Sequence, residues 1–85
     1  MAPEMAKVIP TAPFDSRFFD GAVALDIPAV TLFALVRALD QRAPGFAHAV
    51  EESGLLAVDG AAADDWSIPL AADAEVLIVP RIAGG

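Results

Sequence analysis

Apolar residues recur at helical spacing in the middle of the chain. The positions i, i+3, i+4 and i+7 of this stripe are occupied by Leu32, Leu35, Val36 and Leu39. The pattern predicts the main helix over 31–42, with Thr31 able to cap its amino end. Phe33 falls outside the stripe, and we expect a neighbouring loop to cover it, with a partner surface as the alternative. A shorter helical segment is expected over 46–52, ending at Gly54.

Short apolar or alternating runs predict strands on both sides of these helices. The expected strands are 6–9, 22–27, 55–58 and 75–79, with a brief strand or bridge at 66–68. The last strand should be central and buried, because it is rich in apolar β-branched residues. Pro80 should mark the point where the chain leaves the sheet. Residues 61–65 are expected to form a loop, and Leu70 is expected to point inward.

The segment between the first two strands is less regular than the rest. Pro10 and Pro13 limit the first strand, and the turn signal Asp20-Gly21 precedes the second, so the two strands form a hairpin with a long connection. Its aromatic residues are Phe14, Phe18 and Phe19. We expect them to cover the edge of the core, an exposed binding patch being the alternative.

A hairpin followed by a helix and returning strands predicts an α+β fold of the β-grasp (ubiquitin-like) kind, in which a mixed sheet of four to five strands wraps one main helix. A ferredoxin-like half would instead begin with a strand followed directly by a helix. We expect one domain over 1–85, with a frayed segment at 1–5 and a mobile, flexible Gly-Gly tail at 81–85.

Composition narrows the function. The chain has 85 residues, no cysteine and a formal charge of −7. That charge repels phosphate backbones and argues against nucleic-acid binding, whereas it would steer the protein toward basic patches on protein partners or simply keep it soluble. No apolar run approaches the roughly 20 residues of a membrane span, and no signal peptide is apparent. We therefore expect a cytoplasmic protein without membrane or nucleic-acid partners.

The side chains predict no self-contained active site. His48 is the sole histidine and lacks an evident second ligand, so we expect it at the surface and predict no metal site. The acidic residues lie mostly in turns, where aspartate forms local hydrogen bonds, and no pair has a context that selects it for acid–base chemistry. Neither a nucleophile elbow nor a phosphate-binding glycine loop is present.

The carboxyl terminus is chemically distinctive. The final strand passes Pro80 and continues as Arg81-Ile82-Ala83-Gly84-Gly85. Glycine has no Cβ, so this ending packs poorly but can thread a carboxylate into a narrow site. A carboxylate is ionised at neutral pH and is a poor electrophile, so it needs activation, for example as a mixed anhydride with adenylate.

The terminal segment resembles that of one known family. The segments concerned are Leu56-Ala57-Val58-Asp59-Gly60, Pro69-Leu70 and the final strand with its proline, short tail and Gly-Gly. They are similar to segments of the MoaD/ThiS family of sulfur carriers, which includes the small subunit of molybdopterin synthase. Residues 27–31, which lead into the main helix, add to the likeness, so the resemblance covers about residues 22–85. The extra turns at 44–54 and the length favour the molybdopterin branch over the shorter thiamine-pathway carriers.

The resemblance implies a carrier subunit that is not catalytic alone. An E1-like adenylating enzyme would use ATP to activate Gly85, a persulfide donor would convert it to a thiocarboxylate, and the molybdopterin synthase large subunit would receive the tail in molybdenum cofactor biosynthesis. Gly84 would keep the tail slim, and Arg81, Ile82 and Ala83 would contact partners. No bound cofactor is implied. The alternatives are a ubiquitin-like modifier conjugated through Gly85, a thiamine-pathway carrier and a plain interaction domain.

Overall fold

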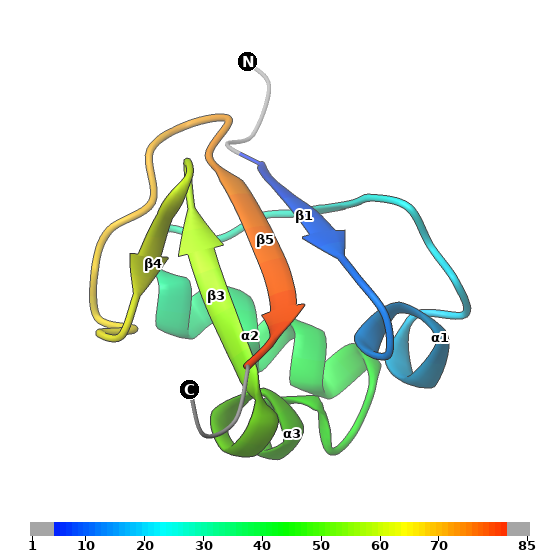
Figure 1. The fold of residues 1–85 in the computed structure, drawn as a ribbon. Helices are drawn as coiled ribbons and strands as arrows, with labels where there is room; N and C mark the ends of the chain where they lie inside the picture. Colours follow the sequence, from blue (N-terminus) through cyan, green and yellow to red (C-terminus); the bar gives the residue numbers. More distant parts are fainter. Residues whose placement is uncertain (1–4, 82–85) are drawn as a thin grey trace.

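The computed structural model describes residues 5–81, which form a five-stranded mixed sheet with helices on one face (Figure 1). The elements in chain order are β1 (Ala6–Pro10), α1 (Phe14–Phe18), β2 (Leu25–Ile27), α2 (Leu32–Arg42), α3 (Phe46–Ser53), β3 (Gly54–Val58), β4 (Ala61–Ala63) and β5 (Glu75–Pro80). The sheet order is β2-β1-β5-β3-β4, with β1 and β5 parallel and the other pairs antiparallel. This is the predicted β-grasp arrangement.

The core lies between the sheet and α2. Val76 and Ile78 of β5 are fully buried, as is Val8 of β1. The helix contributes the predicted stripe, whose members, all at most 2% exposed, are Leu32, Leu35, Val36 and Leu39. Strand residues two apart share a face, so these inward side chains meet the helix in one layer. Leu70 is buried with them, as predicted.

Thr31 caps α2, as predicted. Its backbone is extended, and its Oγ1 accepts a hydrogen bond from the Ala34 backbone N–H at 3.1 Å. The hydroxyl thereby satisfies one of the amide donors that the first helical turn leaves unpaired.

Thr31→Ala is expected to lower the free energy of unfolding by about 1 kcal/mol, because that amide loses its acceptor. Urea denaturation followed by circular dichroism measures the loss. Thr31→Ser keeps the hydroxyl and should retain most of the stability. Equal losses in the two variants would show that the Thr31 methyl group, not the cap, is responsible.

The connection between β1 and β2 contains a helix that the sequence did not predict. Residues Phe14–Phe18 form α1, whose first residue is 1% exposed. Phe18 and Phe19 lie with ring centroids 5.6 and 5.2 Å from that of Phe46, in edge-to-face geometry. The three phenylalanines therefore cover the edge of the core, as expected, and the exposed-patch alternative is wrong. This aromatic packing stabilises a helix too short to be marked by a stripe of its own.

Several strand boundaries also differ from expectation. β1 reaches Pro10, which is buried opposite Ile78, because the next donor, the Thr11 N–H, binds the Ile78 carbonyl at 3.0 Å. β2 covers 25–27 rather than 22–27, and 61–63, expected as a loop, forms β4. Residues 66–68 form a turn, and the isolated bridge joins Thr31 to Pro69 instead.

Candidate functional site

β5 carries the chain from the centre of the sheet toward its carboxyl end. It runs one residue further than predicted, with Pro80 opposite Gly54, and the Arg81 N–H donates to the Ser53 carbonyl at 2.8 Å. The exposed Arg81 therefore leaves the sheet where α3 meets β3. The other predicted tail residues, Ile82, Ala83, Gly84 and Gly85, lie outside the described residues, as do residues 1–4 at the amino end.

Gly54 makes this junction possible. A Cβ at this position would lie 2.6 Å from Val50 Cγ2, 2.9 Å from Phe14 Cζ and 3.0 Å from Val50 Cα. Because real Cβ atoms do not approach other atoms so closely, only glycine lets α3 turn directly into β3 beside the end of β5. From the sequence, this glycine is predicted only as the end of a helix.

The outer face of the sheet is apolar over much of its area. Alternation along the strands places one set of side chains opposite the core: Ile9, Leu55, Ala57, Ala62, Leu77 and Val79. Each is half-buried except Ala62, which is exposed. In Figure 1, α2 lies behind the sheet and α1 and α3 lie beside and below it, so none of them covers this face. The prediction that β5 is central is confirmed, but its burial is confined to the inner face.

Charged and apolar side chains occupy different rows of this outer face. Lys7 is paired in register with Asp26 on one side and Glu75 on the other, which makes a charged row at the start of β1 and β5. The following rows are apolar, and the last of them pairs Val79 with Leu55 next to the point where the chain exits. The apolar surface thus leads from the middle of the sheet to the base of the tail.

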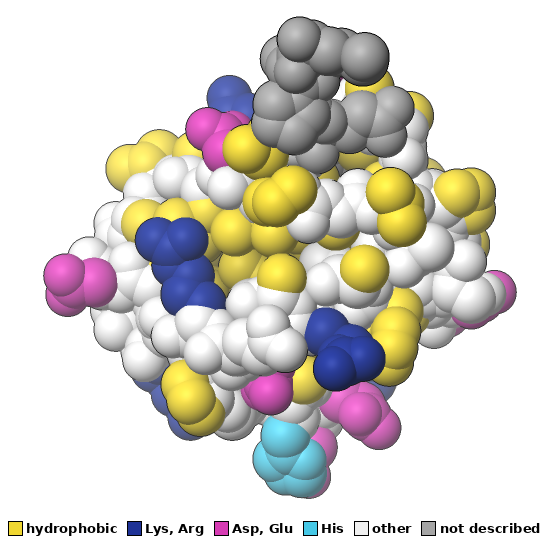
Figure 2. Space-filling view, turned by 180° about the vertical axis from the view of Figure 1, so that it is seen from behind, with side chains coloured by type: hydrophobic (Ala, Val, Ile, Leu, Met, Phe, Trp, Pro, Cys, Tyr) yellow, Lys and Arg dark blue, Asp and Glu magenta, His cyan; other side chains and the backbone are white. Residues whose placement is uncertain are grey.

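The helix side is more mixed. Figure 2 shows hydrophobic side chains there interspersed with basic and acidic ones. Val23, Val30 and Phe33 are exposed, Phe33 by 52%. The expectation that a loop covers Phe33 is wrong: the Trp66 segment approaches α2 through its backbone, the Phe33 N–H donating to the Trp66 carbonyl at 2.6 Å.

Residues 5–81 contain no candidate metal centre. No group of three or more His, Cys, Asp or Glu side chains is placed to hold a metal, and no polar or charged side chain is buried among them. His48 lies at the surface as predicted, 79% exposed, with its Nε2 2.9 Å from a Glu52 carboxylate oxygen. Within the same residues, no helix is long and apolar enough to cross a bilayer.

Comparison with solved structures identifies the fold. The chain is similar to the solution structure of small archaeal modifier protein 1 from Methanosarcina acetivorans, with a TM-score of 0.79, 16% identity and 100% of each chain covered. It is also similar to a structure of the complex of subunits 1 and 2 of molybdopterin-converting factor from Helicobacter pylori, with a TM-score of 0.68 and 22% identity over 95% of this chain and 99% of that chain.

A third similar structure is small archaeal modifier protein 1 from Haloferax volcanii, with a TM-score of 0.72 and 18% identity over 95% of this chain and 99% of that chain. Scans against protein-family models and against curated protein sequences find no match. The structural likeness establishes the ubiquitin-like β-grasp fold that the sequence predicted.

Proposed function

We propose that this protein is a sulfur carrier whose carboxyl-terminal Gly85 is adenylated and then converted to a thiocarboxylate for molybdopterin biosynthesis. The observation that carries the proposal is the apolar outer face of the sheet, which leads along β5 to the base of the Gly-Gly tail. Such a face suits docking onto a protein, and the tail at its end suits delivery of a carboxylate into that protein.

In the proposed function, the reactions take place at the carboxyl terminus and are catalysed by partner enzymes. A free α-carboxylate has a reference pKa of about 3.5, so at neutral pH it is an anion that resists nucleophilic attack. An activating enzyme would join the Gly85 carboxylate to AMP from ATP, releasing pyrophosphate. The terminal sulfur of a persulfide donor would then displace AMP to give an acyl disulfide, and a thiol would reduce its S–S bond to release the thiocarboxylate.

The proposed acceptor is a molybdopterin synthase large subunit. The similar Helicobacter pylori structure is itself a complex of two subunits of molybdopterin-converting factor, which supports a two-subunit assembly here. Docking would cover the rows formed by Leu77 with Ala57 and Val79 with Leu55. The thiamine pathway remains a rival destination for the sulfur.

A second candidate function is protein modification, in which Gly85 is linked to lysine side chains. The likeness to two small archaeal modifier proteins favours it as the alternative. Both functions start from the same adenylate, so the fate of the terminus separates them. A plain interaction domain would need neither a thiocarboxylate at Gly85 nor conjugation to lysines.

Mass spectrometry of the protein from its native host tests the proposal. We expect a fraction whose mass reflects exchange of one oxygen for sulfur at the terminus. That fraction should disappear when the persulfide donor is removed. A Gly-Gly remnant on lysines of other proteins, with no sulfur-bearing form, would instead establish the modifier.

Leu77→Lys is expected to weaken binding to the large subunit by at least about tenfold, because it places a charge at the centre of the apolar outer face. Isothermal titration calorimetry measures the change. The matched control is Val30→Lys, which makes the same charge change at a side chain just before α2 that is already 66% exposed. Equal loss in both variants would remove the docking role of the sheet.

A further inference from the structure

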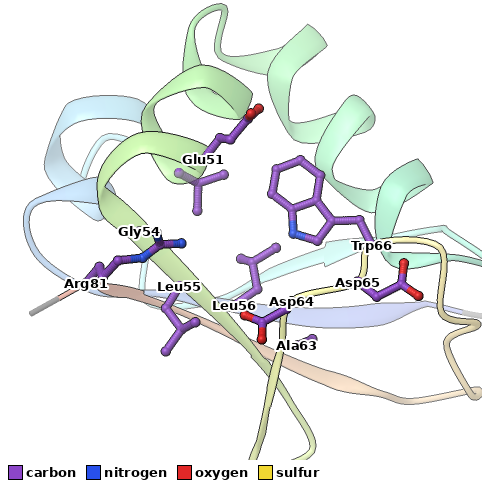
Figure 3. A pocket seen from close by; sticks show the side chains of 10 residues that line it. Glu51, Gly54, Leu55, Leu56, Ala63, Asp64, Asp65, Trp66 and Arg81 are labelled. Atoms are coloured by element: carbon purple, nitrogen blue, oxygen red, sulfur yellow. The ribbon is translucent and has the colours of Figure 1, made fainter.

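A cleft of about 380 Å³ lies beside the base of the tail, between α3, β3 and the loop after β4 (Figure 3). Its floor is apolar, because it includes the fully buried Val50 and Leu56. The half-buried indole of Trp66 forms one wall. The Phe33 N–H binds the Trp66 carbonyl, so the first turn of α2 fixes the backbone that carries this wall.

The rim of the cleft is acidic. Exposed carboxylates come from Glu51, Asp64 and Asp65, whereas Arg81 is the one cation among its lining residues. Figure 3 shows Glu51 and Asp64 on opposite sides of the opening. Asp65 accepts hydrogen bonds from the Ser67 hydroxyl at 2.6 Å and its N–H at 2.9 Å, and these lower the pKa of Asp65, which keeps it ionised.

The carboxylates of the rim are not neutralised by the rest of the fold. Within residues 5–81, the single side-chain ion pair joins His48 to Glu52, neither of which lines the cleft. An apolar floor with an aromatic wall and an anionic rim complements one kind of group: a long side chain with an aliphatic stem and a cationic head. The stem removes apolar surface from water, and the head meets the carboxylates and the indole face.

We propose that this cleft binds a lysine or arginine side chain presented by a basic segment of a protein partner. The net charge of −7 on the chain would steer such a segment toward it. Because Arg81 both lines the cleft and leads into the tail, a protein that takes hold of the tail has the cleft within reach. The inference does not depend on the chemistry at Gly85, so it can fail or succeed separately from the proposed function.

Trp66 provides a direct readout, because the chain has one tryptophan and no tyrosine. The probe is a blocked glycine–arginine peptide, titrated at low ionic strength, with the same peptide containing citrulline in place of arginine as the neutral control. We expect a saturable change in Trp66 fluorescence with the arginine peptide only. An equal response to citrulline, or no response to arginine, would overturn the proposal.

Two charge-matched double variants test whether the cleft itself is responsible. The double variant Glu51→Gln with Asp64→Asn should weaken binding of the arginine peptide by about tenfold. Asp20→Asn with Asp26→Asn, which removes the same charge outside the cleft, should change binding by less than about twofold, since the Coulomb energy falls with distance from the bound side chain. Equal weakening would show a non-specific response to net charge. If spermidine bound as tightly as the peptide, the cleft would be a site for small polyamines, and the proposal of a protein partner would be overturned.

Discussion

Gly54→Ala is expected to lower the free energy of unfolding by about 3 kcal/mol, because the added methyl group overpacks the core. The added Cβ would meet Val50 Cγ2 at 2.6 Å and Phe14 Cζ at 2.9 Å, both on fully buried side chains, and the Val50 Cα at 3.0 Å. Side chains in a packed core have little room to retreat, so the backbone of α3 or β3 must shift. Chemical denaturation measures the loss.

The Val50→Ala background supplies the control. It removes the nearest of the three clashing atoms, so the cost of Gly54→Ala should be smaller there than in the parent protein, giving a favourable coupling energy in the double-mutant cycle. The coupling should be partial, because the Phe14 ring and the Val50 Cα remain close. Additive effects of the two substitutions would mean that the steric account is wrong. Gly54 has φ −120°, which any residue can adopt, so backbone strain does not provide another explanation.

Deleting Gly84 and Gly85 is expected to abolish adenylation and sulfur loading entirely while leaving the fold intact. Within residues 5–81 the buried core residues all lie between Ala6 and Ile78, so the deletion removes none of these core side chains. What it removes is the Gly-Gly end at which the proposed function places the reactive carboxylate. Pyrophosphate release with the activating enzyme and ATP measures the first step, and thermal unfolding checks the fold.

The Gly85→Ala variant separates the two requirements of this end. It keeps a carboxylate at the same chain length but adds a methyl group, so its activation should be slowed rather than lost. If the shortened protein still formed an adenylate, the carrier function would be excluded. If it kept all biological function without forming one, the plain interaction domain would be established.

The sequence predicted those elements whose own residues specify them. α2 has a complete apolar stripe and a capping threonine, and β5 is a continuous apolar run, so both were placed within a residue or two. α1 and β4 were missed because neighbours create them. The five residues of α1 are held by aromatic packing, and Ala61–Ala63, with low strand propensity, is extended only because it pairs with β3.

The candidate site was predicted in part. The final strand and Gly-Gly can be recognised in the sequence. Whether the outer face of the sheet is exposed cannot, because that depends on how many layers of helices cover the sheet. A continuous apolar run usually indicates a strand buried on both sides, whereas here the helices cover one side and leave Leu77 and Val79 half-buried on the other. The cleft at Trp66 joins residues from α3, β3 and a distant loop, so no local pattern could mark it.

The position of β5 also affects how the protein is made. β5 is the last strand within residues 5–81 yet sits between β1 and β3, so without it the sheet is split into a β1–β2 pair and a β3–β4 pair. Two-stranded pieces of this size are marginal in water. During synthesis the domain therefore cannot close until Pro80 has left the ribosome. A chain terminated before the end of β5 would stay unfolded and open to proteolysis, so it would be degraded rather than accumulate.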